Sequence, residues 1–167
     1  MKKSALIFLS LLLLLPCSCK RYSKKDILGV WMMAHSTNHP NQYLAGLNNL
    51  NLFWYQDNDT VLNASFSGGI MSGEVPTFND LDSELMSGTW KVSGDKVYRN
   101  LGFGRDTLII KSLEREKNMV VIKKTWLFKP DTLTLIYLAD DINKALLRIK
   151  AMCSIGKKAS RLDYLDN

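Results

Sequence analysis

Hydrophobic and polar residues alternate in a series of short runs between residues 88 and 138. The runs are separated by turn-forming sequences such as Ser-Gly-Asp at residues 93–95 and Lys-Pro-Asp at residues 129–131. This alternation is typical of antiparallel strands joined by hairpins. The pattern therefore predicts a β-meander of five strands, over residues 89–92, 97–103, 107–113, 119–128 and 133–138.

The first half of the chain contains three more strand patterns. They cover residues 26–35, 50–55 and 60–66, and the last two flank an Asx-rich turn that indicates a hairpin. Residues 36–49 are polar and predict a long loop with a helical turn at residues 43–47. Residues 67–87 show no sustained period, and we expect this loop to lie across one mouth of the folded domain.

Beyond Leu138 the hydrophobic period becomes helical. A helix capped by Asp140 or Asp141 would place one set of small and apolar residues on a single face: Ile142, Ala145, Leu146, Ile149 and Cys153. Gly156 is expected to end this helix. A final strand over residues 147–152 is the alternative, because those residues also alternate.

These elements favour one all-β domain over residues 26–156, followed by a solvated tail at residues 157–167. Eight short strands in sequence order favour an antiparallel up-and-down barrel, because closure removes exposed strand edges. We therefore predict a barrel of about eight strands with a C-terminal helix.

A Gly-x-Trp sequence occurs twice, at Gly29 to Trp31 and at Gly88 to Trp90. A tryptophan near the start of a strand can close one end of a small barrel, and its indole N–H can bond a backbone carbonyl. A glycine just before it permits a close crossing or a bulge. Both tryptophans are expected in the core.

The first residues have the pattern of an export signal. Lys2 and Lys3 precede an apolar stretch at residues 5–15, which is too short to span a bilayer permanently. Two cysteines follow, at positions 17 and 19, and the stretch resembles a bacterial lipoprotein signal, in which such a cysteine is acylated. Cleavage before Cys17 would place a rigid proline beside the cut bond, so Cys19 is the expected lipidation site.

This interpretation gives a signal peptide at residues 1–18 and a basic tether at residues 19–25. The alternative is a plain secretory signal with incidental cysteines. On the lipoprotein interpretation Cys153 is the one cysteine left besides Cys19, so no internal disulfide is expected.

The net charge of +6 is unevenly distributed. Residues 19–25 carry four basic and no acidic side chains, whereas residues 26–139 carry 10 basic and 12 acidic ones. A slightly acidic barrel argues against nucleic acid as a partner. Cations directly after an acylated cysteine instead favour contact with anionic lipid headgroups.

Residues 26–139 resemble the lipocalin-like domains of Gram-negative bacterial lipoproteins. The resemblance rests on the lipidation-type signal, Gly29 and Trp31 on the first strand, the second Gly-x-Trp before a hairpin, and the late strand that begins Asp131-Thr132-Leu133. It implies an eight-stranded barrel that binds a small apolar or amphipathic molecule. It also implies a location in the cell envelope, and the basic tether favours the periplasmic face of the outer membrane.

Aromatic residues of the predicted strands are the candidate walls of such a cavity: Trp54, Trp90, Tyr98, Trp126 and Phe128. Lys124 shares a face with Val120 and Ile122, so an inward Lys124 would be a candidate contact for an anionic ligand. A bulge that turns Lys124 outward is the alternative.

No nucleophile, base and orienting group can be named together, so an enzyme is not expected, and neither is a cofactor. His35 and His39 lack a third partner for zinc, and Cys153 is more simply a buried small residue. The alternative to ligand binding is a solid barrel that contacts another envelope protein through the loops at residues 36–49 and 67–87.

Overall fold

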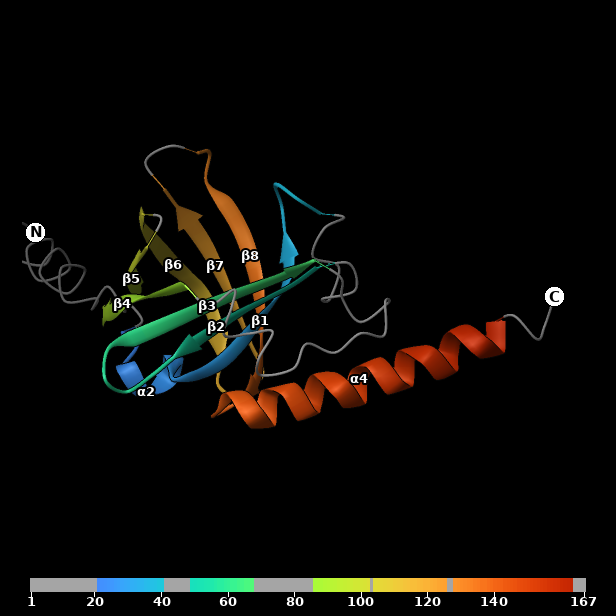
Figure 1. Cartoon of the computed structure of the whole chain (residues 1–167). Helices are drawn as coiled ribbons and strands as arrows, with labels where there is room; N and C mark the ends of the chain where they lie inside the picture. The colour runs from blue at the N-terminus through green and yellow to red at the C-terminus, as the bar shows by residue number, and fades with distance from the viewer. Residues whose placement is uncertain (1–20, 41–48, 68–85, 103, 126–127, 164–167) are drawn as a thin grey trace, which may run out of the picture.

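The computed structural model describes residues 21–40, 49–67, 86–102, 104–125 and 128–163. Eight antiparallel strands form a closed barrel in chain order (Figure 1), which confirms the predicted fold class. The strands are β1 (Gly29–Ser36), β2 (Asn49–Tyr55), β3 (Thr60–Ser67), β4 (Met86–Ser93), β5 (Lys96–Leu101), β6 (Gly104–Glu114), β7 (Asn118–Lys124) and β8 (Asp131–Ala139). Pairing of β1 with β8 closes the barrel.

Residues 24–27 differ from the sequence prediction, which divided them between a tether and the first strand. They form a short helix, α2 (Lys24–Ile27). Its first turn is held by Asp26, whose Oδ2 accepts hydrogen bonds from the backbone N–H and the hydroxyl of Ser23, at 2.8 and 2.7 Å. Such a reciprocal cap stabilises a helix start, and it places Ile27 in the core.

The two tryptophans of the Gly-x-Trp sequences are buried at the α2 end of the barrel, as predicted. The Trp31 indole N–H donates to the carbonyl of Ile27 at 2.8 Å, and that of Trp90 donates to the carbonyl of Gln56 at 3.1 Å. Tyr137 packs edge-on against Trp31, with ring centroids 5.3 Å apart. These contacts close this end, which we call the closed end.

The glycine of each sequence allows a close approach of two strands. Gly29 has φ of +113°, and a Cβ on it would lie 2.7 Å from the carbonyl oxygen of Ala139. A Cβ on Gly88 would lie 2.2 Å from the carbonyl oxygen of Asn100. Neither position accepts a side chain without a shift of the backbone.

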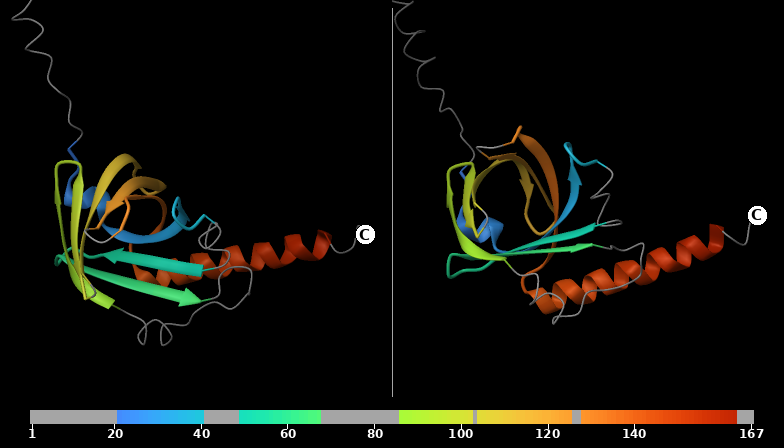
Figure 2. Two further views of the ribbon diagram at one scale, coloured as in Figure 1. Left: turned by 90° about the horizontal axis from the view of Figure 1, so that it is seen from above. Right: turned by 45° about the horizontal axis from the view of Figure 1, so that its top comes forward.

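A second apolar core lies outside the barrel, beneath α4 (Ile142–Asp163). The helix packs against outward residues of β1 and β8 (Figure 2). The predicted apolar face is confirmed, with Ile142, Ala145, Ile149 and Cys153 buried. Asp141 caps the helix by accepting the N–H of Lys144 at 3.0 Å.

The helix continues through Gly156 to Asp163, so the predicted end at Gly156 is wrong. A glycine inside a helix costs only about 1 kcal/mol relative to alanine, which a long helix tolerates. The predicted helical turn at residues 43–47, most of the loop at residues 67–87 and the signal peptide lie outside the described residues. Of the helices in the described ranges, none has the length and apolarity needed to cross a membrane.

Candidate functional site

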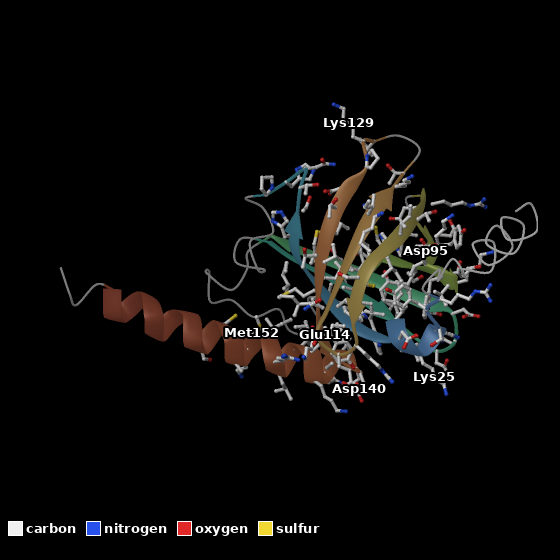
Figure 3. All side chains as sticks on the ribbon, turned by 180° about the vertical axis from the view of Figure 1, so that it is seen from behind. Lys25, Asp95, Glu114, Lys129, Asp140 and Met152 are labelled. Carbon is white, nitrogen blue, oxygen red and sulfur yellow. The ribbon has the colours of Figure 1, made fainter. Side chains whose placement is uncertain are left out.

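A cavity of about 500 Å³ opens at the end of the barrel opposite α2. Figure 3 shows Lys129 at this open end, whereas Glu114 and Asp140 lie at the closed end. Its apolar wall is formed by inward side chains of the strands, and Phe128 lines the mouth. The wall residues are Met33, Phe53, Leu101 and Leu133. The closed end is filled by the tryptophans, so the cavity occupies only the upper part of the barrel.

The structure does not gather the predicted cavity residues into one wall. Trp54 points outward and packs against the core under α4, and Trp90 is buried at the closed end. Tyr98 is exposed on the outer face of β5. Phe128 lines the cavity mouth and is 74% exposed, and Trp126 lies outside the described residues.

Lys124 is also exposed on the outside, and its neighbour Lys123 takes the inward position. Met119 and Val121 belong to the inner core, so the face of β7 that carries Val120 is the outer one. Both faces of this strand are apolar, so the alternation alone left the inward and outward positions of Lys124 open, and the structure has the outward one. The lysine that lines the cavity is Lys123.

An ion pair that the sequence analysis missed lies inside the barrel. Arg99 and Asp106 are 2% and 8% exposed, and the guanidinium donates to both carboxylate oxygens, at 2.7 and 2.5 Å. Arg99 also donates to the hydroxyl of Tyr55 at 3.2 Å and lies 4.6 Å from the ring centroid of Phe53. Direct pairing of the two residues across β5 and β6 sets this bidentate geometry.

The pattern of β5 contained a signal for this pair. Arg99 alternates with Val97 and Leu101, both of which are buried in the barrel. A charged residue at an inward position needs a partner there. Asp106 is the residue opposite it after the next turn.

The ion pair between Arg99 and Asp106 affects the protonation of the titratable groups around it. Burial by itself lowers the pKa of Arg99, but the interactions with Tyr55 and Asp106 outweigh burial, so the net pKa is raised. The guanidinium therefore stays protonated. Burial and the nearby Arg99 lower the pKa of Lys123, whose ammonium lies 3.9 Å from Asp106. Burial also raises the pKa of the Tyr55 hydroxyl, which therefore remains a neutral donor and acceptor.

Two amide side chains on the cavity wall have unused acceptors. The Oδ1 atoms of Asn51 and Asn63 are buried and accept no hydrogen bond within the described part of the chain. Asn63 is 5% exposed. A buried carbonyl oxygen without a donor destabilises a fold by about 1–3 kcal/mol, so a bound molecule that donates N–H or O–H groups would stabilise this wall once the two amides turn toward the cavity.

The rim of the cavity is fixed by Asp131 at the start of β8. Its carboxylate accepts the hydroxyls of Ser36 and Thr37, at 2.7 and 2.9 Å, and the backbone N–H of Asn38 at 3.1 Å. Partial burial by itself raises the pKa of Asp131, but these hydrogen bonds outweigh it and hold the pKa below its usual range.

We expect Asp131→Asn to destabilise the protein by about 1 kcal/mol at neutral pH, because an ionised acceptor makes stronger hydrogen bonds than an amide. The folded pKa of Asp131 lies below the unfolded value, so this stabilisation is complete above about pH 4 and is lost as the pH falls through the folded pKa. Urea unfolding of both proteins at neutral and acidic pH measures the difference. A gap that stays constant or widens in acid would contradict this account.

No protein-family model matches the chain, and no curated protein is significantly similar to it. Within the described ranges, no three His, Cys, Asp or Glu side chains are grouped as a metal site. His35 is exposed, as is His39 at the cavity mouth.

Proposed function

We propose that this protein is a membrane-anchored lipoprotein of the cell envelope whose lipocalin-like barrel binds one small amphipathic molecule. The observation that carries the binding role is the cavity of about 500 Å³ with unused acceptors at Asn51 and Asn63. Ligand sites are typically concave and mainly apolar, with a few polar groups that orient the ligand.

The two kinds of wall favour a ligand with two parts. Phe53, Leu101 and Leu133 provide contacts for an alkyl chain. Asn51 and Asn63 accept hydrogen bonds from a polar head that carries hydroxyl or amide donors. Lys123 donates to an acceptor oxygen of the same head, since its ammonium is only loosely paired with Asp106.

The anchor is supported by the sequence. An apolar stretch at residues 5–15 precedes Cys19, and basic residues follow it. Acyl chains on Cys19 would hold the protein at the membrane, and the tether cations would strengthen contact with anionic lipid.

The variant Asn63→Leu is expected to change ligand affinity and fold stability in opposite directions. Replacement of an unused buried acceptor by an apolar side chain of similar size is expected to stabilise the fold by about 1 kcal/mol. The same change should weaken binding of 1-lauroylglycerol, which donates two hydroxyls, by about tenfold, since one hydrogen bond of about 1.4 kcal/mol is lost. Methyl laurate has no donor, so its weaker affinity should not fall.

Isothermal titration calorimetry measures both affinities, and urea unfolding measures stability. Asn100→Leu is the matched control, because Asn100 is exposed on the outer face of β5. Equal loss of affinity for both lipids in Asn63→Leu would contradict the donor role of the ligand. A flat titration of the wild-type protein with a broad panel of amphiphiles would contradict the binding function itself.

A further inference from the structure

The outer surface of the barrel is divided into two faces. Beneath α4, outward residues of β1, β2, β3 and β8 form an apolar core with the helix. The outer face of β4 to β7 lies on another side of the barrel (Figure 2), and none of its residues belongs to that core. We call the outer side of β4 to β7 the basic face, for the charges that it carries.

Five exposed cations lie on the basic face: Lys91, Lys96, Arg105, Lys111 and Lys124. The strand register places Lys91 opposite Tyr98, and Thr107 opposite Lys124, in one row across the sheet. None of the five forms an ion pair with another described residue. Among the described residues of β4 to β7, the one exposed acidic residue is Glu114, at the closed end of β6.

The closed end carries charges of both signs. Acidic side chains are gathered in the turns there: Asp57, Asp59, Glu114, Glu116, Asp140 and Asp141. Several of them are paired with lysines, such as Asp59 with Lys24 at 2.8 Å and Asp140 with Lys144 at 2.9 Å. Because cations such as Arg115, Lys117 and Lys144 balance these acids, the closed end is nearly neutral, and an anionic surface is attracted more strongly to the unpaired cations on the side of the barrel.

The position of the N-terminal segment would bring one end of the basic face near a membrane to which Cys19 is anchored. The backbone N–H of Tyr22 donates to the carbonyl of Gly94 in the turn between β4 and β5, at 2.9 Å. Tyr22 is three residues after Cys19, and three residues span at most about 11 Å. An acylated Cys19 at a bilayer surface would therefore hold this turn within roughly one Debye length of the lipid headgroups, which is about 8–10 Å at physiological salt.

We propose that the basic face is the surface through which the barrel lies on the membrane, where it binds the phosphates of anionic phospholipids. The orientation rests on the proposed anchor at Cys19, whereas the affinity of the face for anionic lipid does not. In this orientation the open end, with Lys124 at its edge, faces along the bilayer surface. A ligand can then pass between the headgroup region and the cavity.

Vesicle binding by a chain that begins at Lys20 tests the face without the anchor. All eight described strands and both cores follow residue 20, so this chain retains the barrel. The probe is sedimentation with vesicles of phosphatidylcholine alone or with added phosphatidylglycerol. We expect binding only to the anionic vesicles.

Two triple variants with the same change in net charge identify the surface. The face variant is Lys91→Gln, Arg105→Gln and Lys124→Gln, and the control, at the closed end, is Arg115→Gln, Lys117→Gln and Lys144→Gln. The face variant should lose about tenfold or more in affinity for anionic vesicles, because each cation near a charged surface contributes to binding. The control should bind nearly as well as the unmodified chain.

Equal binding by the two variants would assign the affinity to the tether cations and overturn the proposal. Tighter binding to a DNA duplex than to vesicles, abolished in the face variant, would assign the face to nucleic acid and overturn it as well. Failure of the anchor is a separate result, because it would appear as unchanged membrane attachment after substitution of Cys19.

Discussion

Arg99→Met is expected to lower the free energy of unfolding by about 3–5 kcal/mol, because removal of one partner leaves a buried charge uncompensated. Asp106 is 8% exposed and, of the cations in the described residues with which it forms an ion pair, would retain only Lys123, 3.9 Å away. The Tyr55 hydroxyl would also lose the N–H that it accepts at 3.2 Å. Urea unfolding followed by tryptophan fluorescence measures the change.

The double variant Arg99→Met, Asp106→Leu is the control. Replacement of a whole buried ion pair by apolar side chains of similar volume is often neutral or stabilising. The double variant should therefore recover most of the stability that the single variant loses. A single variant within about 1 kcal/mol of the wild-type protein, well below the usual effect of breaking a buried pair, would show that this pair does not hold the barrel interior together.

Cys19→Ala is expected to release nearly all of the protein from membranes or to block its maturation. Without acyl chains, the remaining attraction comes from cations, and high salt shortens the Debye length to about 3 Å and removes it. The measurement is the fraction of protein in the membrane pellet after a high-salt wash, together with the mass of the mature chain.

Cys17→Ala is the matched control, since Cys17 lies two residues earlier and is expected to be removed with the signal. This variant should sediment with membranes like the wild-type protein. Release by Cys17→Ala with retention of Cys19→Ala would contradict the assignment of Cys19. Retention of both variants in the pellet would contradict a lipid anchor altogether.

The barrel and its closed end were predictable because local patterns determine them. Alternation and turn residues marked every strand to within a few positions, and each Gly-x-Trp sequence marked a close crossing of strands. The helix was also predictable, because its apolar residues recur at helical spacing and Asp141 caps it.

The cavity wall was not predictable in the same way. On β2 the inward Phe53 and the outward Trp54 are both apolar, because α4 covers the outside of that strand. Period-two alternation cannot assign such a strand to inside and outside. For the same reason the sequence left the inward and outward positions of Lys124 open on β7, and the structure has the outward one.

The basic face could not be predicted from the net charge of the barrel segment. The barrel segment is slightly acidic in total, yet all its lysines and arginines fall between Lys91 and Lys129. Antiparallel pairing of β4 to β7 then collects five of them on one side, and the acids of the described turns lie at the closed end. Only the strand register reveals this separation.

The measurement that tests the central claim most directly is a crystal structure of the chain from Lys20 grown with 1-lauroylglycerol. We predict one lipid in the barrel, with its hydroxyls bonded to Oδ1 of Asn51 and Asn63 and its chain against Phe53, Leu101 and Leu133. A barrel interior filled by protein side chains, or a lipid bound only outside the barrel, would contradict the proposed function.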